Sequence, residues 1–352
     1  MAVARFTLSQ LPRSAILNVL STMDFVSLVL LSLVSNKSKL LVKSLNIKAC
    51  RFRLEVENST IALSLALFRH YQQSWDVICL ELQYREYPNQ KCDAYQSHAA
   101  VLFEKPLNDE HPPERLTVPK KFNGLQFWLS HFKTLFSSLK CGSLEFYENK
   151  FDLQTIRSHF QNVPPMIIYA DSLESNRQIL KTFPTVSSII MGNKAFEESK
   201  IPSQLLIGNI NELTIGTTNS LSLLELDDIL QVNAFQFSIH NAKLQENEFN
   251  RFLKLWIRGC WPRTERILLT IRTEDEAREP NKNMIFKNIK YQEIPSDQEH
   301  EHYTSSGWNW TAIGGYNIWR KDGTRATLEL EYSSMRIYLG FYVWHSHCIR
   351  EK

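Results

Sequence analysis

Hydrophobic residues near the start of the chain recur at the three- and four-residue spacing of an amphipathic helix. Ile16, Leu17 and Leu20 share one side of such a helix. Pro12 precedes them, at a position where the first turn of a helix tolerates proline. Asp24 then offers a side-chain oxygen that can cap a following helix. The pattern therefore predicts one helix before Asp24 and another after it.

The second helix is expected in the run FVSLVLLSLV, residues 25–34, which is apolar on more than one face and must be buried from several sides. Ser35 or Asn36 can cap a third, basic helix in which Leu41 and Leu45 share a face. Three short helices in about 45 residues bury too little surface to be stable alone. We therefore expect part of their apolar surface to meet a partner or the rest of the chain.

The segment between these helices and residue 140 gives mixed signals. Residues 51–57 and 77–82 alternate polar and apolar side chains, which predicts half-buried strands. Residues 61–68 fit either a third strand or a short helix, and the pattern does not separate the two. Residues 83–119 lose periodicity and gather prolines, which indicates a long surface connection. Apolar residues return at helical spacing in residues 122–139 and predict a helix.

A short strand-like string then recurs at intervals of roughly 22 to 32 residues, which is the range of repeat architectures with one strand and one helix per unit. The strings occupy residues 144–146, 166–168, 189–190, 213–215, 235–239 and 267–271, with helical candidates at 153–160, 173–183, 223–230 and 246–257. Because each unit can bury its apolar faces only against its neighbours, the spacing predicts a leucine-rich-repeat-like array of parallel strands backed by helices. A doubly wound sheet is the alternative.

The last part of the chain favours a small antiparallel sheet that caps the array. Residues 326–332 and 336–344 alternate well, and the turn sequence KDGT at 321–324 precedes them. The acidic, histidine-bearing residues 295–303 are interpreted as a loop. The predicted fold class is α/β with an all-α N-terminal part. The predicted domains are a helical domain at 5–50, a transition of strands, helix and long loop at 51–140, and a repeat-like α/β domain at 141–345.

Composition and charge indicate a folded protein and argue against nucleic acid and membranes as partners. Hydrophobic residues make up 43% of the 352 residues and charged residues 22%, as in a folded protein with a sizeable core. The formal net charge is only +3, and no Lys/Arg cluster is interleaved with aromatic residues, so no nucleic acid is expected as a partner. The strongest apolar run spans about ten residues where a membrane helix needs roughly 20, so no membrane is expected either.

Cysteine usage bears on the compartment. The six cysteines are scattered and form no CxxC pair, as expected of reduced thiols, which predicts a cytoplasmic or nuclear protein. A secretion signal is the alternative, because Arg5 and Arg13 precede the apolar run. Pro12 and Asp24 interrupt the approach to that run, however, and no clean cleavage site follows it.

Few residues suggest catalysis or metal binding. The strings HEH at 300–302 and HSHC at 345–348 come closest to a metal-ligand set, but neither has C-x-x-C or H-E-x-x-H spacing. Asp227 and Asp228 are neighbours on a predicted helix and point to different sides of it. We therefore expect no metal, no cofactor and no enzymatic activity. Five tryptophans are interpreted either as recognition residues or, more simply, as core: Trp256, Trp261, Trp308, Trp310 and Trp319.

The N-terminal segment LPRSAILNVLSTMDFVSLVLLSLVSNKSK resembles an F-box of the large nematode F-box families. The Leu-Pro start, the Ile-Leu-x-x-Leu helix, the Met-Asp before the second helix and the Leu-Ser-Leu-Val-Ser stretch carry the resemblance. It implies binding to the adaptor subunit of a cullin-RING (SCF-type) ubiquitin ligase, and through it to the cullin scaffold. The residues implied in docking are Leu11, Pro12, Ile16, Leu17, Leu20, Phe25, Leu28 and Leu31.

The stretch from NELTIG to RILLTI, residues 211–271, is similar to the F-box-associated domain of type 2 found in the same nematode proteins. Its Leu-Thr-Ile strand, Leu-Asp-Asp-Ile-Leu helix and Phe-Leu-Lys-Leu-Trp-Ile-Arg-Gly segment are the most characteristic parts. The two resemblances imply a substrate-recognition adaptor that holds an unknown target protein. The alternative is an interaction scaffold with a decayed F-box, because Arg13-Ser14, Ser35 and Lys39 stand where many F-boxes have an acidic residue, a cysteine and a tryptophan.

Overall fold

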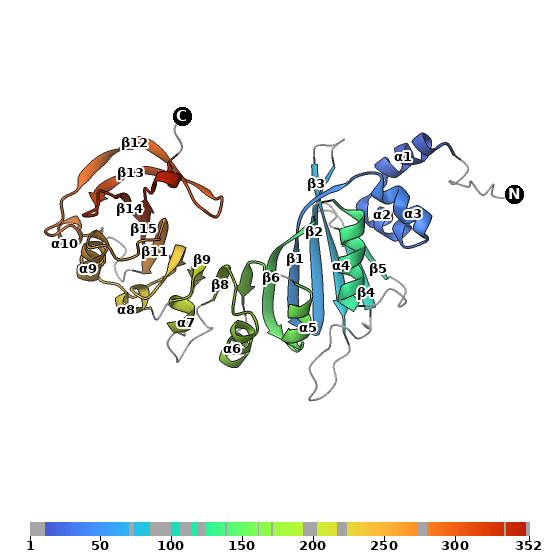
Figure 1. Ribbon diagram of the computed structural model, residues 1–352, viewed down its shortest axis with the longest axis horizontal. Coiled ribbons are helices and arrows are strands. Elements are labelled where there is room, and N and C mark those ends of the chain that lie inside the picture. Colours follow the sequence, from blue (N-terminus) through green and yellow to red (C-terminus); the bar gives the residue numbers. More distant parts are fainter. Residues whose placement is uncertain are drawn as a thin grey trace. The chain divides into compact units, whose positions relative to one another are not determined.

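A computed structural model of the protein divides the chain into two compact units, residues 1–164 and 165–352 (Figure 1). Among the described residues, no helix is long and apolar enough to cross a membrane. The structure describes residues 11–69, 74–84, 100–105, 114–117, 124–137, 139–160, 162–169, 172–192, 203–216, 224–272, 280–333 and 336–349.

The first unit begins with three short helices, α1 (Arg13–Thr22), α2 (Phe25–Ser32) and α3 (Asn36–Lys43). Both predicted caps are present: the Asp24 carboxylate accepts a hydrogen bond from the Ser27 amide at 2.9 Å, and the Ser35 hydroxyl accepts one from the Ser38 amide at 3.1 Å. The prediction of a helical N-terminal part is confirmed.

In the described part of the first unit, the sheet has six strands in the order β6-β1-β2-β3-β4-β5. β1 pairs in parallel with β6, and the other neighbours are antiparallel. Residues 61–68, for which the sequence pattern did not separate a strand from a helix, belong to the strand β2. The bounds are β1 (Lys48–Asn58), β2 (Thr60–Arg69), β3 (Ser74–Gln83), β4 (Ala100–Lys105), β5 (Glu114–Thr117) and β6 (Lys140–Asn149).

The prediction of a connection without strands at 83–119 is wrong, because β4 and β5 lie within it. β4 pairs with β3, and β5 pairs with β4. Such short strands are stabilised by a neighbouring strand edge rather than by their own sequence pattern. Neither strand contains a proline, so the prolines elsewhere in the interval concealed the strand signal.

The predicted helix after this interval is α4 (Gly124–Leu135), which runs along the sheet of the first unit (Figure 1). Its apolar stripe is buried, with Trp128 and Phe132 inaccessible to solvent. Ring contacts continue to Phe136, whose ring centroid lies 5.9 Å from that of Phe132. A second helix, α5 (Leu153–Ser158), is capped by the Asp152 carboxylate.

The second unit begins with five parallel strands that lie side by side in chain order, with a helix between each pair of consecutive strands. This order differs from the reshuffled order of a doubly wound sheet. The five predicted strand positions from 166–168 to 267–271 and their parallel pairing are confirmed, whereas the first predicted string, 144–146, belongs to β6 of the first unit. The strands are β7 (Met166–Ile168), β8 (Ser188–Met191), β9 (Ile210–Ile215), β10 (Ala234–Ile239) and β11 (Arg266–Arg272), and the helices are α6 (Leu173–Thr182), α7 (Ser203–Leu206), α8 (Leu226–Ile229) and α9 (Glu246–Ile257).

Register places one buried residue from each strand in a continuous row. Met166, Ile189, Leu213, Phe237 and Ile267 are paired along this row, and each is almost inaccessible. The core of the second unit therefore lies against one face of the parallel strands.

The predicted antiparallel sheet follows, and β15 joins it to β11. The elements are α10 (Lys282–Ile285), β12 (Gln292–Tyr303), β13 (Asn309–Trp319), β14 (Arg325–Ser333), β15 (Arg336–Val343) and the 3₁₀ turn η3 (Ser346–Cys348). The interpretation of residues 295–303 as a loop is wrong, because they belong to β12. This strand lies at the sheet edge and is mostly solvent-exposed, so it lacks the apolar alternation of a half-buried strand. Pro295 falls within the register shift between Ile294 and Glu299, where the ladder has no need of its missing N–H.

Both faces of β15 are covered, which explains its almost continuous burial. On one face, the Phe341 ring meets the Trp256 ring at a centroid distance of 5.1 Å. On the other face, Tyr342 packs in a cluster with Ala312 and Trp344. Among the tryptophans, Trp256 and Trp261 are core, Trp310 packs against that cluster, and Trp308 and Trp319 are 54% and 41% exposed.

Candidate functional site

The N-terminal module, residues 11–47 with α1 to α3, is the first candidate site. Half of the residues predicted to dock a partner lie in its own core. Ile16, Leu20, Phe25 and Leu28 are between 0% and 5% exposed. They hold the three helices together and cannot offer their side chains directly to a partner without rearrangement.

The other half of the predicted set reaches the surface. Leu11, Leu17 and Leu31 are partly exposed, and Pro12 is exposed. Leu11 and Pro12 lie at the start of α1, where the Pro12 carbonyl accepts the first hydrogen bond of the helix from the Ile16 amide. These side chains can contact another protein while the helices stay folded.

Sequence reasoning missed three large aliphatic residues that the module exposes. Val19, Val34 and Leu40, hereafter the exposed aliphatic residues, are 43%, 75% and 66% accessible. A helical wheel could have found Leu40, because it precedes the buried Val42 by two residues and so lies on the opposite side of α3. Val34 follows the end of α2, where no buried stripe continues. These three side chains are accessible for contact with another protein while the helices stay folded.

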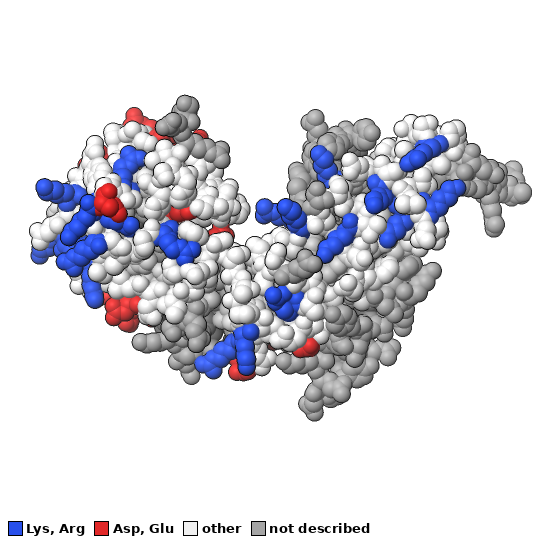
Figure 2. Space-filling view, in the orientation of Figure 1, with Lys and Arg blue, Asp and Glu red and all other residues white. Residues whose placement is uncertain are grey.

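Charge on the module is predominantly positive. Residues 11–47 contain one acidic residue, Asp24, whose carboxylate accepts hydrogen bonds from the amide and hydroxyl of Ser27. Figure 2 shows Lys and Arg side chains over the α1–α3 end of the chain, with no acidic side chain among them on this face. The basic residues of the module are Arg13, Lys37, Lys39 and Lys43. The surface therefore favours an acidic partner.

A buried polar contact fastens the module to α4. The Ser32 hydroxyl donates to the Val29 carbonyl, and its oxygen lies 2.8 Å from His131 Nε2. Because the only hydroxyl hydrogen of Ser32 is given to Val29, His131 must donate the second bond through Nε2–H. Burial, helped by the positive charge of Lys39, lowers the pKa of His131 to about 4. The histidine is thus neutral near pH 7, and it stacks on the Phe127 ring.

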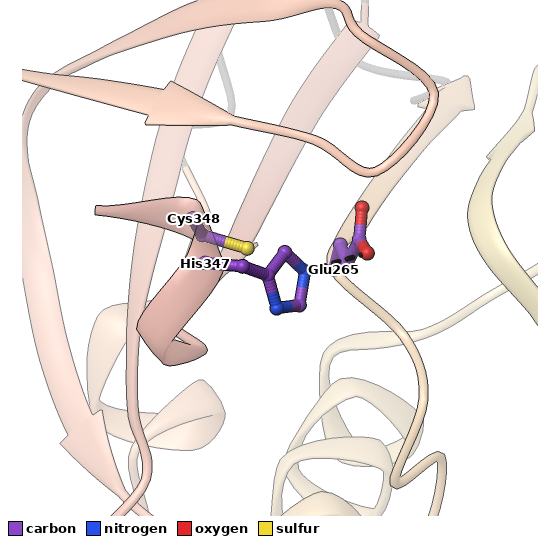
Figure 3. Close-up of side chains that lie close together, drawn as sticks. All are labelled: Glu265, His347 and Cys348. Atoms are coloured by element: carbon purple, nitrogen blue, oxygen red, sulfur yellow. Dashed lines mark hydrogen bonds and ion pairs between the residues drawn. The ribbon is translucent and has the colours of Figure 1, made fainter. Parts of the chain in front are cut away.

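A second candidate lies in the other unit, where Glu265, His347 and Cys348 converge (Figure 3). Each offers one ligand atom, and these atoms all lie within 4.8 Å of one another. Glu265 precedes β11 and its side chain is fully buried, whereas His347 and Cys348 belong to η3. His347 Nε2 lies 2.8 Å from Glu265 Oε1. The Ser305 amide also donates to the other carboxylate oxygen at 2.9 Å.

This second cluster has no catalytic relay. The Ser305 hydroxyl donates to Glu265, and its oxygen lies 3.2 Å from His347 Nε2. The same ring nitrogen therefore faces both the hydroxyl and the carboxylate, whereas a nucleophilic triad needs them on opposite nitrogens of the imidazole. Burial and the nearby Glu265 charge raise the pKa of the Cys348 thiol to about 12, so it is protonated near pH 7 and is a poor nucleophile.

The remaining histidines and carboxylates weighed in the sequence have structural partners. His302 is buried, and its Nε2 lies 3.0 Å from the Val343 carbonyl. His300 lies two residues away on the same face of β12, against the Trp344 ring. Asp228 accepts the Glu225 amide in a capping box at the start of α8. Sequence distance hid the Glu265 cluster, because Glu265 and His347 lie 82 residues apart.

Comparison with known proteins locates two domains. Residues 8–50 match the family described as F-box domain, and residues 201–269 match the family described as F-box associated. The first match covers the N-terminal module, and the second covers β9 to β11. The F-box associated domain-containing protein sdz-33 of Caenorhabditis elegans is 24% identical over 330 residues, which are 93% of this chain and 94% of that protein. No solved structure matches the chain.

Proposed function

We propose that this chain, which belongs to the F-box proteins that carry an F-box-associated domain, is the substrate-recognition adaptor of a cullin-RING (SCF-type) ubiquitin ligase. The observation that carries the proposal is the coincidence of the F-box match with a separate three-helix module that exposes aliphatic side chains. A module of this kind leaves apolar surface that a partner protein can bury.

In this proposal the module docks to the ligase adaptor subunit, which connects it to the cullin scaffold. Leu11, Pro12, Leu17 and Leu31 contact the adaptor subunit directly, together with the exposed aliphatic residues. Ile16, Leu20, Phe25 and Leu28 act indirectly, because they fix the three helices in the shape that presents those contacts. The basic side chains around the module increase the rate of encounter with an acidic partner.

The second unit then holds a target protein. The chain performs no chemistry itself, because other ligase subunits transfer ubiquitin and the adaptor raises the effective concentration of the target beside them. We propose a leucine-rich-repeat-like body for this role, since five parallel strands follow chain order with helices between them. We also propose domain limits at 5–50, 51–140 and 141–345, and a location in the cytoplasm or nucleus.

The test is coprecipitation of the purified full-length chain with the ligase adaptor subunit. The double variant Leu11→Ala/Pro12→Ala is expected to lose most of the bound adaptor, because it removes two surface contacts at the start of α1. Ile207→Ala is the matched control, since it shortens an aliphatic side chain that is 56% exposed in the second unit. Unchanged recovery of the adaptor by the double variant contradicts the docking role of these residues.

The alternative function is an interaction scaffold outside any ligase. Arg13-Ser14, Ser35 and Lys39 favour it, because many F-boxes have other residue types at these positions. Ser35 caps α3, so this departure maintains the fold of the module while altering its surface. Stable recovery of other proteins from cells, without any cullin subunit, would favour the scaffold.

A further inference from the structure

We infer that Glu265, His347 and Cys348 form a binding site for a divalent cation of the zinc class. The three ligand atoms, a carboxylate oxygen, an imidazole nitrogen and a thiol sulfur, converge from two segments far apart in sequence (Figure 3). This inference is independent of the docking proposed for the N-terminal module, because it concerns a different unit of the chain.

The donor set suits a borderline-soft cation. Zinc binds sulfur, imidazole nitrogen and carboxylate oxygen, often with three protein ligands and a fourth position left to water. A hard cation such as magnesium or calcium would instead require a set of oxygen ligands. The mixture of one oxygen, one nitrogen and one sulfur therefore points to zinc chemistry rather than to a cluster of surface acids.

Burial distinguishes this cluster from a chance gathering of polar side chains. The Glu265 side chain is 0% exposed, and Cys348 is also 0% exposed. A buried charge is stabilised by an opposite charge or by strong hydrogen bonds. Ser305 and His347 already supply hydrogen bonds to Glu265, and a bound cation would add an opposite charge beside the buried carboxylate.

Distances allow coordination with a small closure of the cluster. Bonds of about 2.0 Å to oxygen and nitrogen and about 2.3 Å to sulfur place these ligands of a tetrahedral zinc site about 3.3–3.5 Å apart. The ligand atoms here lie within 4.8 Å of one another, so they need to approach by about 1.5 Å at most. His347 Nε2 and Glu265 Oε1 are already 2.8 Å apart and would separate slightly around the ion.

Access and proton balance are also satisfied. The His347 side chain is 51% exposed, so a cation can reach the cluster from solvent, and water or the Ser305 hydroxyl can fill the fourth position. As the metal–ligand bonds form, the sulfur–hydrogen bond of Cys348 breaks and its proton goes to solvent. The Nε2 proton that His347 shares with Glu265 also leaves, and the ring carries its proton on Nδ1 instead, so that the Nε2 lone pair can coordinate the ion. No oxidant or reductant is needed.

The bound ion would clamp the end of the chain. Glu265 lies directly before β11, Cys348 lies in η3, and Ser305 lies in the turn between β12 and β13. A cation at this point links the last turn of the second unit to its central sheet. Since it binds the folded state, it stabilises that unit by an amount that grows with the logarithm of its concentration above the Kd.

The experiment uses the full-length chain and cobalt(II) as a spectroscopic substitute for zinc. We expect cobalt to produce a near-ultraviolet absorption from thiolate-to-cobalt charge transfer, and zinc to abolish it by competition. Cys348→Ser should lose this absorption. The matched control, Cys260→Ser, should keep it, because it changes a partly buried thiol of the same unit outside the cluster.

A second variant separates the loss of a metal ligand from misfolding of the chain. His347→Gln changes an exposed side chain and should weaken cobalt binding at least about tenfold, as losses at metal sites commonly do. Zinc at 100-fold excess over its Kd should raise the melting temperature of the wild-type chain by roughly 5–10 °C, but not that of either cluster variant. Cobalt binding without the thiolate absorption, an unchanged absorption in Cys348→Ser, or no binding at all would overturn the inference.

Discussion

Replacing His131 with glutamine removes a titrating group from the buried joint between α2 and α4 while keeping an N–H donor for Ser32. Folding lowers the pKa of His131 from 6.5 to about 4, because burial and Lys39 both disfavour the imidazolium. As the pH falls from about 6.5 toward about 4, the unfolded chain therefore binds a proton that the folded chain resists. The wild type loses stability over this window, and the glutamine variant lacks this contribution.

The magnitude follows from the two pKa values. Each pH unit between them weakens the folded state by up to about 1.36 kcal/mol, so the loss approaches about 3 kcal/mol near pH 4. Because other buried histidines also titrate, the quantity of interest is the difference between the wild type and His131→Gln at each pH. In a chain that keeps His131, Lys39→Met should reduce the loss of stability between about pH 6.5 and pH 4, because it removes the second cause of the lowered His131 pKa.

The assay is urea unfolding at a series of pH values, combined with hydrogen exchange of the α4 amides. Exchange localises the effect to the first unit, and comparison at equal pH cancels the intrinsic exchange rates. Below about pH 6.5, the free energy of unfolding of the wild type should fall progressively relative to that of the variant. Parallel pH profiles for the two chains would refute the assignment of a buried neutral His131 at this joint.

Three further substitutions test the packing. Leu20→Ala should cost about 2–5 kcal/mol in urea unfolding, because Leu20 is fully buried in the module, and a loss under 1 kcal/mol would contradict that burial. Asp24→Ala should lower the free energy of unfolding by about 1 kcal/mol, because it removes the cap of α2. Thermal melting followed by helical circular dichroism measures this loss, and an unchanged melting curve would contradict it. Gly315→Ala should lower the melting temperature more than Gly323→Ala, because both have positive φ but an added Cβ at Gly315 would lie 2.5 Å from the Leu328 carbonyl oxygen; equal effects would argue against the close approach.

Local sequence signals predicted the elements whose stability is local. The caps at Asp24 and Ser35 and the apolar stripe of α4 could be found, because each depends on residues within a few positions of one another. The parallel strands were also found, since their short apolar strings recur regularly. β4 was missed because its partner β3 lies beyond a connection without a strand pattern. β12 was missed because, as a mostly exposed edge strand, it lacks the apolar alternation of a half-buried strand.

The candidate sites were predictable to a lesser degree. The helical pattern identified the apolar residues of the module. It could not distinguish the surface residue Leu11 from the core residue Leu20, because burial depends on how the three helices pack. Val34 and Leu40 did not fit the amphipathic stripes and so were omitted. The convergence of Glu265 with Cys348 arises from the pairing of β11 with β15, which no local pattern reveals.

The most direct test of the central claim is the equilibrium affinity of the full-length chain for the ligase adaptor subunit. The double variant Val34→Ser/Leu40→Gln removes two exposed aliphatic side chains without touching the core. Burial of one such side chain contributes about 1.5–3 kcal/mol, so the double variant should bind at least about tenfold more weakly, with Ile207→Gln unchanged as the control. If the double variant binds the adaptor subunit as tightly as the wild type, or if the wild type does not bind it, docking through these residues is contradicted.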